Sequence, residues 1–251
     1  MAVYKTKLVK KEEVAEGTMA FYFEKPEGFE FIAGQYVTVS LINPPETDDE
    51  GNSRFFSLIA APYENYLGIA TRMRDTDFKR VLKNLPIGSE VKITGPDGSF
   101  CLHKDASQPA VFLIGGIGVT PVFSILKNAA YKKLPHQLFL FYSNKRPEDA
   151  AFLKELQSLE KENKNFKLIA TMTAPTESRS PDQSVGKKLK QAWLGETGFI
   201  NKEMLQKHIG DLNSPIYYMS GPPAMVKAMI ELAEKIGAND DNIIFEEFAG
   251  Y

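Results

Sequence analysis

The stretch SRFFSLIAAP, residues 53–62, combines residue types that suit a flat ligand carrying negative charge. The ring of Phe56 offers a stacking face, the guanidinium of Arg54 suits a phosphate, and the hydroxyl of Ser57 suits the polar edge of a ring. These features describe a flavin, whose ring system is flat and whose phosphates are anionic. Because side chains alternate along a strand, at least one of Phe55 and Phe56 also fits the alternative role of a core residue.

Two glycine-containing segments indicate a second site, which binds a nucleotide. IGGIGVTP, residues 114–121, and SGPPAMV, residues 220–226, each lie between a predicted strand and a predicted helix, where glycine permits close backbone approach and the helix N-terminus favours phosphate. Ligands of open parallel sheets bind beyond the carboxyl ends of strands, so both segments point to one crevice. Each alone also fits an ordinary strand–helix turn, since neither has the full G-x-G-x-x-G pattern. The residues concerned are Gly116, Gly118, Thr120, Pro121, Ser220, Gly221, Pro222 and Met225.

The end of the next predicted strand bears on which nucleotide binds. An acidic residue there holds a free ribose 2′-hydroxyl, as in NAD sites, whereas basic residues accommodate a 2′-phosphate. The sequence YSNKRPED places Ser143, Asn144, Lys145 and Arg146 first, and acidic residues come only later. This order favours NADPH over NADH. The alternative is a solvated loop followed by the acidic residues that commonly begin a helix.

The composition is that of an ordinary globular protein with room for two domains. The chain has 251 residues, of which 43% are hydrophobic and 25% charged. A formal net charge of -2 without a basic cluster argues against nucleic acid as a partner, because phosphate binding needs clustered Lys and Arg. The single cysteine, Cys101, and the scattered histidines predict neither an intrachain disulfide nor a metal or iron–sulfur site.

We expect a cytoplasmic monomer without a membrane span. The N-terminal sequence MAVYKTKLVKKEEV lacks the apolar core of a signal peptide, and no apolar run is long enough to cross a bilayer. The absence of disulfides fits a reducing compartment.

The pattern of apolar and polar residues divides the sequence into two parts that position these sites. Residues 1–104 contain short alternating segments broken by Gly and Pro, which predict an antiparallel barrel or sandwich with one helix at TDFKRVLKNLPIG. Residues 105–251 alternate apolar strands with helices, which predicts a parallel sheet covered by helices on both faces. The polar segment HKDASQP, residues 103–109, is the expected linker.

The chain resembles the ferredoxin–NADP reductase superfamily over nearly its whole length. The resemblance rests on motifs in the family's order, namely RFFS in place of Arg-x-Tyr-Ser, then GPDGSF, GGIGVTP, SGPPAMV and an aromatic C-terminus. It implies an FAD-binding β-barrel in residues 1–104 and an NAD(P)-binding α/β domain in residues 105–251. The implied activity is hydride transfer between NAD(P)H and FAD, with single electrons passing between FAD and a separate carrier such as ferredoxin or flavodoxin.

The resemblance also implies roles for residues of the first part. Arg54 is expected at the FAD pyrophosphate, Phe56 (with Phe55 beside it) on the flavin, and Ser57 near the flavin N5. The strand IATRM, with Arg72 and Met73, is expected to line the pyrimidine edge through its backbone. The expected pyrophosphate-facing helix contributes Phe78 and Lys79.

In the second part, the resemblance places Thr120 beside the nicotinamide, with Gly221 and Pro222 opposite. The sequence also departs from the family pattern. Phe56 replaces a tyrosine and loses its hydroxyl, Thr76 and Lys79 stand where many members have glycine and serine, and Ser220 stands where many have a cysteine beside the nicotinamide.

The C-terminal sequence FEEFAGY supplies the last expected residues. Tyr251 or Phe248 is expected to stack on the flavin face that the nicotinamide must reach. Glu246 and Glu247 alternate in side, so at most one enters the crevice, where a carboxyl group relays a proton. We assign this role to Glu247. The alternative is a solvated terminus.

Two other functions stay open from the sequence. The first keeps the same half-reaction with another acceptor, as in the reductase component of an oxygenase or a reductase of free flavin or quinone. The second is a non-catalytic subunit that binds nucleotide without transferring hydride, which the departures at Phe56 and Ser220 keep open.

Overall fold

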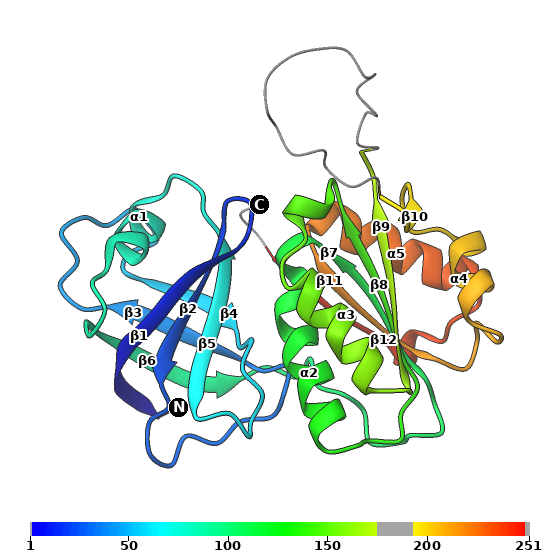
Figure 1. Ribbon diagram of the computed structural model, residues 1–251, viewed down its shortest axis with the longest axis horizontal. Coiled ribbons are helices and arrows are strands. Elements are labelled where there is room, and N and C mark those ends of the chain that lie inside the picture. The colour runs from blue at the N-terminus through cyan, green and yellow to red at the C-terminus, as the bar shows by residue number, and fades with distance from the viewer. Residues whose placement is uncertain (1, 175–192, 249–251) are drawn as a thin grey trace, which may run out of the picture.

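The computed structural model describes residues 2–174 and 193–248. Its first part is a six-stranded antiparallel sheet in the order β4-β3-β6-β1-β2-β5. A bridge between Leu58 and Ile69 joins the end of β4 to β5 and closes the sheet into a barrel (Figure 1). The strands are β1 (Val3–Ala15), β2 (Thr18–Glu24), β3 (Tyr36–Leu41), β4 (Ser53–Ser57), β5 (Tyr66–Arg72) and β6 (Glu90–Asp97).

Strict alternation of side chains gives the barrel its core. Val37, Val39 and Leu41 of β3 are buried, whereas the residues between them are partly exposed. One end of the barrel is covered by α1 (Asp77–Asn84), which the sequence predicted. Thr76 caps this helix by accepting a hydrogen bond from the Lys79 amide, and its apolar face enters the barrel core.

The second part is a six-stranded parallel sheet in the order β10-β9-β8-β7-β11-β12. Helices α2 and α3 cover one face of it, and α4 and α5 cover the other (Figure 1). The strands are β7 (Ala110–Gly115), β8 (Leu138–Asn144), β9 (Phe166–Met172), β10 (Glu196–Thr197), β11 (Ile216–Gly221) and β12 (Ile243–Glu247). The helices are α2 (Val119–Tyr131), α3 (Leu153–Glu162), α4 (Lys202–His208) and α5 (Pro223–Lys235), with 3-10 turns η1 (Gly116–Gly118), η2 (Pro147–Asp149) and η3 (Asp240–Asn242). The fold class predicted from the sequence is confirmed.

Two details of the second part differ from what the sequence predicts, namely a helix opened by Pro147 and a helix capped by Thr120. The segment after β8 begins with the turn η2 at Pro147, and α3 starts only at Leu153, because Phe152 takes a left-handed conformation (φ 58°) that interrupts the helix. The hydroxyl of Thr120 does not cap α2 but donates to the Ile117 carbonyl, within the turn that precedes the helix.

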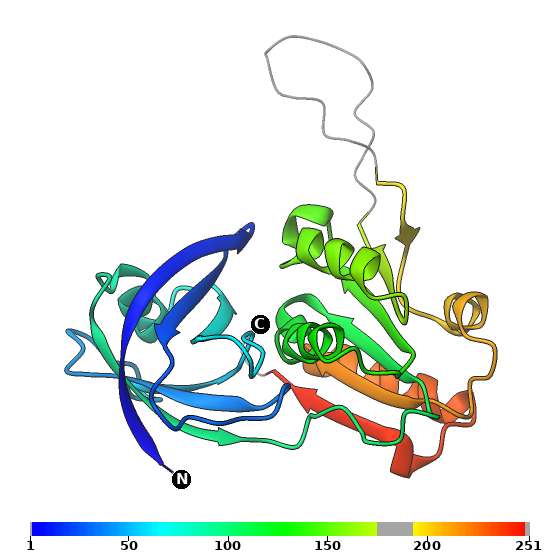
Figure 2. The same ribbon diagram turned by 60° about the horizontal axis from the view of Figure 1, so that its bottom comes forward.

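The long β1–β2 hairpin reaches across to the second part, as Figure 2 shows. At its tip, the Glu16 amide donates to the Glu148 carbonyl over 2.8 Å, and the Glu16 carboxylate pairs with Arg146 over 3.1 Å. A further link joins Ser124 of α2 to the Ala60 carbonyl over 2.5 Å. These contacts fix the barrel and the parallel sheet on either side of the groove described next.

Candidate functional site

Three cationic side chains converge where β4 meets α1. Arg54 lies on β4, Lys79 in the first turn of α1, and Arg74 in the connection that leads to α1. Burial, together with the charges of Arg74 and Arg54, lowers the pKa of the Lys79 ammonium. Asp48 and Glu50 pair with Arg54, but like charges at one place still favour a further anion, and a helix N-terminus strengthens that preference. The cluster therefore fits a phosphate or pyrophosphate group.

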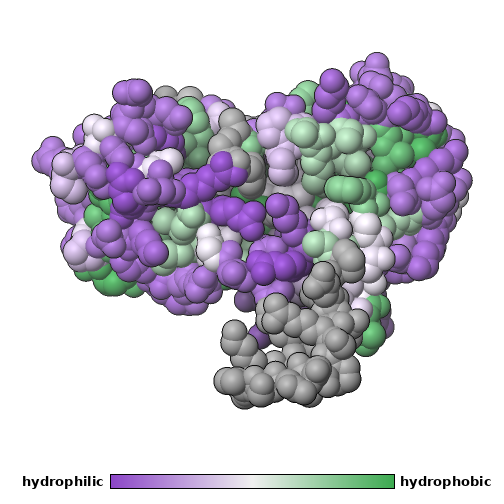
Figure 3. Space-filling model, turned by 90° about the horizontal axis from the view of Figure 1, so that it is seen from above, coloured by the Kyte–Doolittle hydropathy of each residue, from purple (hydrophilic) through white to green (hydrophobic). Residues whose placement is uncertain are grey.

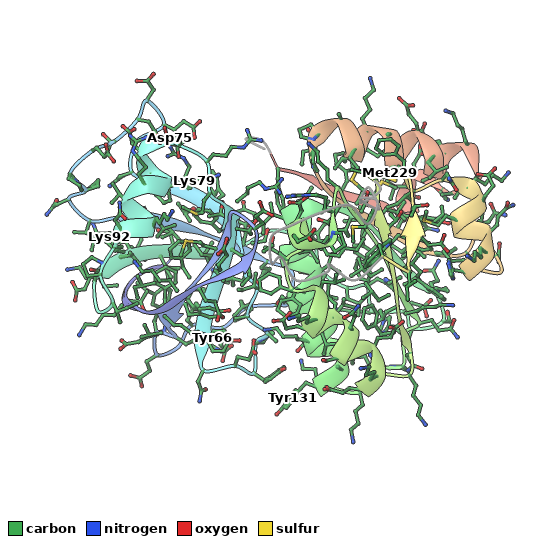
Figure 4. The ribbon with its side chains drawn as sticks, turned by 45° about the horizontal axis from the view of Figure 1, so that its top comes forward. Tyr66, Asp75, Lys79, Lys92, Tyr131 and Met229 are labelled. Atoms are coloured by element: carbon green, nitrogen blue, oxygen red, sulfur yellow. The ribbon has the colours of Figure 1, made fainter. Side chains whose placement is uncertain are left out.

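Arg54 is held in place by the barrel. Its guanidinium lies over the Phe78 ring, 5.1 Å from the ring centroid, and forms ion pairs with Asp48 and Glu50. Phe78 is itself buried at 1% exposure, so it supports Arg54 from below and does not line the surface. Figure 4 shows the position of Lys79 on this end of the barrel.

The neighbouring phenylalanines face opposite ways. Phe56 lies on the same face of β4 as Arg54 and packs on Phe78, with ring centroids 6.0 Å apart. Phe55 points to the other face, where it is 73% exposed and meets the edge of the Tyr36 ring. The structure therefore brings Phe56 to the cation cluster and does not bring Phe55 there, in contrast to the expectation for Phe55. Strand alternation is the physical reason.

A groove of about 780 Å³ lies between the carboxyl ends of the parallel strands and the barrel. Arg72 and Arg74 enter it from the barrel, so the groove and the cation cluster are continuous through Arg74. In Figure 3, paler and apolar residues over the second part meet the hydrophilic surface of the barrel along this side. Seven residues expected at a cofactor line the groove, namely Arg72, Gly116, Ser143, Asn144, Lys145, Pro222 and Met225.

The glycines at the carboxyl ends of β7 and β11 have different structural roles. A Cβ atom on Gly118 would lie 2.3 Å from the Ser220 carbonyl oxygen, and one on Gly221 would lie 3.0 Å from the Gly115 carbonyl oxygen. Gly118 and Gly221 therefore let the two loops cross each other, rather than a ligand approach. Gly116 has φ +54° and open space beyond it, so it is the glycine whose backbone is free to approach a ligand.

Asn144 has a buried amide with unsatisfied hydrogen-bonding capacity. It is 6% exposed at the end of β8, and within the described part of the chain neither its amide nitrogen nor its oxygen has a hydrogen-bond partner. A buried polar group without a partner costs about 1–3 kcal/mol. A ligand in the groove with both donor and acceptor atoms, such as a nucleotide, would satisfy both ends of this amide.

Ser220 and Glu246 form a second polar pair, near the carboxyl ends of β11 and β12. They are direct partners in the β11–β12 ladder, and Ser220 is fully buried. Burial raises the pKa of the Glu246 carboxyl to about 7. Glu247 is exposed on the opposite side of β12. The carboxyl that points inward is thus that of Glu246, which corrects the choice of Glu247, because the register with β11 decides which side faces the interior.

Other expected residues lie outside the groove wall. Arg146 forms ion pairs with Asp149 and Glu16, at 2.7 and 3.1 Å, and the pair with Glu16 links the two parts. The Met73 amide donates to Gly17 within the barrel, so it is not free for a ring edge as expected. The remaining positions are Thr120 and Pro121, both buried in α2, and Phe248, whose amide donates to the Gly221 carbonyl; Tyr251 lies outside the described residues.

Several groove residues were missed by the sequence analysis. Arg74 comes from the barrel, Thr173 follows β9, and Phe199 and Asn201 follow β10. In the sequence, only their position just after a strand could have indicated that these residues line the groove. The short strand β10 has too few residues to be recognised by alternation.

Comparison with known proteins supports the fold and the nucleotide-binding part. Residues 112–231 match the family model described as the oxidoreductase NAD-binding domain. A ferredoxin NADP+ reductase from Neisseria gonorrhoeae, solved with bound FAD and NADP, superposes with a TM-score of 0.75 at 19% identity, covering 98% of each chain. The comparisons thus give residues 112–231 the NAD-binding domain family and the whole chain the fold of a ferredoxin reductase, in agreement with the resemblance seen in the sequence.

Curated relatives that align with most of this chain are longer proteins. One subunit of the Na(+)-translocating NADH-quinone reductase of Idiomarina loihiensis is 29% identical over 84% of this chain and 48% of its own length. The reductase component of propane 2-monooxygenase of Rhodococcus jostii is 27% identical over 89% of this chain and 57% of its own. The chain therefore spans about half the length of these relatives. Among the described residues, none of the helices is both long and apolar enough to cross a membrane.

Proposed function

We propose that this chain transfers hydride from NAD(P)H, bound in the groove, to FAD held against the barrel, and that a separate protein then takes the electrons singly. The observation that carries the proposal is the convergence of Arg54, Arg74 and Lys79 beside the stacking ring of Phe56. This arrangement provides an anion site and an aromatic platform side by side, which is what a flavin dinucleotide requires.

The barrel residues hold and orient the first cofactor. Arg54 and Lys79 pair with its pyrophosphate at the positive end of the α1 helix. Phe56 stacks on the ring, and Ser57, at the end of β4 and 5% exposed, donates a hydrogen bond to the ring edge. When bound, FAD supplies the conversion between two-electron and one-electron transfer.

The groove residues hold the second cofactor. The backbone at Gly116 approaches the phosphates of the nucleotide closely. The buried side-chain amide of Asn144 forms hydrogen bonds with the nucleotide, and Lys145 binds a ribose phosphate. Ser220 presents a buried hydroxyl at the carboxyl end of β11, beside the nicotinamide. Glu246, whose pKa is about 7, holds a proton near neutral pH next to Ser220.

The electron acceptor we propose is a separate one-electron carrier protein. The named relatives support an acceptor of this general kind, since one of them is a reductase component that serves an oxygenase. The same likeness, over 89% of this chain, makes service to an oxygenase the second candidate function.

Binding of flavins to the apoprotein tests the proposed FAD site. We expect FAD to bind at least tenfold more tightly than riboflavin, because the cation cluster contacts only the phosphates. Fluorescence titrations with FAD, FMN and riboflavin measure the difference. Equal affinity for FAD and riboflavin would show that the cation cluster binds no phosphate of the flavin and would contradict the proposal.

A further inference from the structure

We infer that the Asp48 carboxylate is an internal ligand of the FAD phosphate site and that FAD displaces it on binding. This inference rests on the proposed function and adds a residue that controls how tightly the protein holds its flavin. Asp48 belongs to the segment that joins β3 to β4, residues 42–52, with the sequence INPPETDDEGN. We call this segment the acidic loop.

The acidic loop and the start of β4 contact every nitrogen of the Arg54 guanidinium. Its Nη2 atom donates to the Asp48 carboxylate, and its Nε atom pairs with the Glu50 carboxylate over 2.9 Å. Its Nη1 atom donates to the backbone carbonyls of Glu50, Gly51 and Ser53 over 3.2, 3.0 and 2.8 Å. A phosphate pairs with the same guanidinium atoms, so it competes with the acidic loop for Arg54.

Asp48 lies between Arg54 and the N-terminus of α1. The Arg54 guanidinium holds the pKa of the Asp48 carboxyl below its usual range, and the backbone amide of Phe78 acts in the same direction. Phe78 belongs to the first turn of α1. An arginine and a helix N-terminus are the features that favour a phosphate at this place, so Asp48 presents its negative charge where the pyrophosphate is proposed to bind.

The charges of the site favour exchange of Asp48 for the pyrophosphate. The cationic groups are Arg54, Arg74 and Lys79, and the carboxylates are those of Asp48 and Glu50. FAD brings one negative charge on each phosphate. Added beside both carboxylates, the pyrophosphate would give four negative charges against three positive ones. When it replaces Asp48 alone, three negative charges face three positive ones, which is the more favourable arrangement.

Release of Asp48 requires only a local change in the acidic loop. Asp48 begins a tight turn, in which the Gly51 amide donates to the Asp48 carbonyl over 2.8 Å and Gly51 takes a left-handed conformation (φ +76°). Earlier in the loop, Glu46 accepts two hydrogen bonds of 3.2 Å from Arg80 of α1. A rotation within the turn therefore moves Asp48 away from Arg54, while the β3–β4 pairing and the contact of Glu46 with Arg80 stay in place.

Flavin binding to the apoprotein of Asp48→Asn tests the inference. We expect the Kd for FAD to fall by about threefold to tenfold, because a competing internal contact lowers the apparent affinity by the fraction of protein in which the site is open. The Kd for riboflavin, which has no phosphate, should stay unchanged. The matched control is Asp49→Asn, the same change of charge at the exposed neighbouring position, which should leave both constants unchanged.

Two further readouts separate competition from a structural role. Asp48→Asn removes a counter-charge from Arg54, so the Tm of the apoprotein should fall while the affinity for FAD rises. A purely structural role for Asp48 would make both quantities fall. In stopped-flow fluorescence, FAD should associate faster with Asp48→Asn than with Asp49→Asn, because no carboxylate has to leave Arg54 first.

Two outcomes would overturn the inference. The first is an equal Kd for FAD in Asp48→Asn and Asp49→Asn. The second is weaker FAD binding by Asp48→Asn, which would make Asp48 a residue that positions Arg54 for the phosphate. The proposed function fails separately, if the unmodified protein binds FAD and riboflavin equally. A gain of affinity for FAD alone in Asp48→Asn would support the inference even then.

Discussion

Ser220 on β11 and Glu246 on β12 stand directly opposite each other in the parallel ladder, and each has a buried oxygen without a hydrogen-bond partner among the described residues. A core selected only for stability would not keep such a pair, since each unsatisfied group costs about 1–3 kcal/mol. Both groups lie near the carboxyl ends of their strands, and Pro222, two residues after Ser220, lines the groove. Their arrangement is accounted for if a bound nucleotide completes it.

Replacing Ser220 with alanine separates a role in stability from a role in nucleotide binding. We expect Ser220→Ala to leave the free energy of unfolding of the ligand-free protein unchanged or higher, because no hydrogen bond is lost. Flavin reduction by NADPH should slow by about 2- to 10-fold, the value of one neutral hydrogen bond. Chemical denaturation and stopped-flow absorbance measure the two effects.

The matched control is Ser124→Ala. Ser124 is equally buried, but its hydroxyl donates to the Ala60 carbonyl, so its loss should lower stability by about 1 kcal/mol. If Ser220→Ala destabilised the ligand-free protein as much as Ser124→Ala, the Ser220 hydroxyl would have a structural partner after all.

The Glu246 carboxyl should make stability depend on pH. Its pKa rises from an ordinary value of 4.5 to about 7 in the folded chain through burial. Between these pH values the Glu246 carboxyl is ionised in the unfolded chain but keeps its proton in the folded chain. Its contribution to the free energy of unfolding is therefore complete below about pH 4.5 and is lost as pH rises through about 7. In Glu246→Gln this decline should disappear, whereas Glu247→Gln, at an exposed position, should retain it. Denaturation curves at pH 5 and pH 8 measure this loss of stability. A loss preserved in Glu246→Gln would contradict its assignment to the Glu246 carboxyl.

Lys79 should contribute to FAD affinity without contributing to apoprotein stability. Its ammonium is partly desolvated and faces Arg74 and Arg54, so Lys79→Ala relieves repulsion in the absence of ligand. We expect the Kd for FAD to rise by about 10- to 100-fold, which corresponds to the loss of a charge-assisted hydrogen bond. Lys83→Ala, in the exposed last turn of the same helix, is the control. An equal effect of both variants would contradict a specific phosphate contact.

Lys145 should set the preference between the two nucleotides. It lines the groove, whereas its neighbour Arg146 is held by Asp149 and Glu16 outside it. We expect Lys145→Ala to lower kcat/KM for NADPH about tenfold more than that for NADH, since only NADPH carries the 2′-phosphate. Arg146→Ala should leave the ratio unchanged. Equal losses for both nucleotides in Lys145→Ala would place Lys145 away from the 2′-phosphate.

Local sequence signals predicted much of the fold and part of the site. The alternation of β3 and the capped helix α1 are properties of a few adjacent residues, and so is the cluster of Asn144 and Lys145 at the end of β8. Such features are visible in the chain because the residues that make them are neighbours in it.

Features that depend on distant contacts were not predictable. Alternation showed that Glu246 and Glu247 face opposite ways, but only pairing with β11 determines that Glu246 faces inward. The reason for glycine at Gly118 lies at the Ser220 carbonyl, about a hundred residues away along the chain. Arg74 enters the groove because the barrel packs beside the parallel sheet, which no local pattern encodes.

An anaerobic absorbance titration of the FAD-loaded protein, first with NADPH and then with NADH, tests the central claim most directly. The account predicts that stoichiometric nucleotide bleaches the flavin absorbance. NADPH should act at lower concentration than NADH, because Lys145, rather than an acidic residue, directly follows Asn144 in the groove wall. A protein that binds FAD but is bleached by neither nucleotide would contradict hydride transfer and would favour a non-catalytic nucleotide-binding subunit.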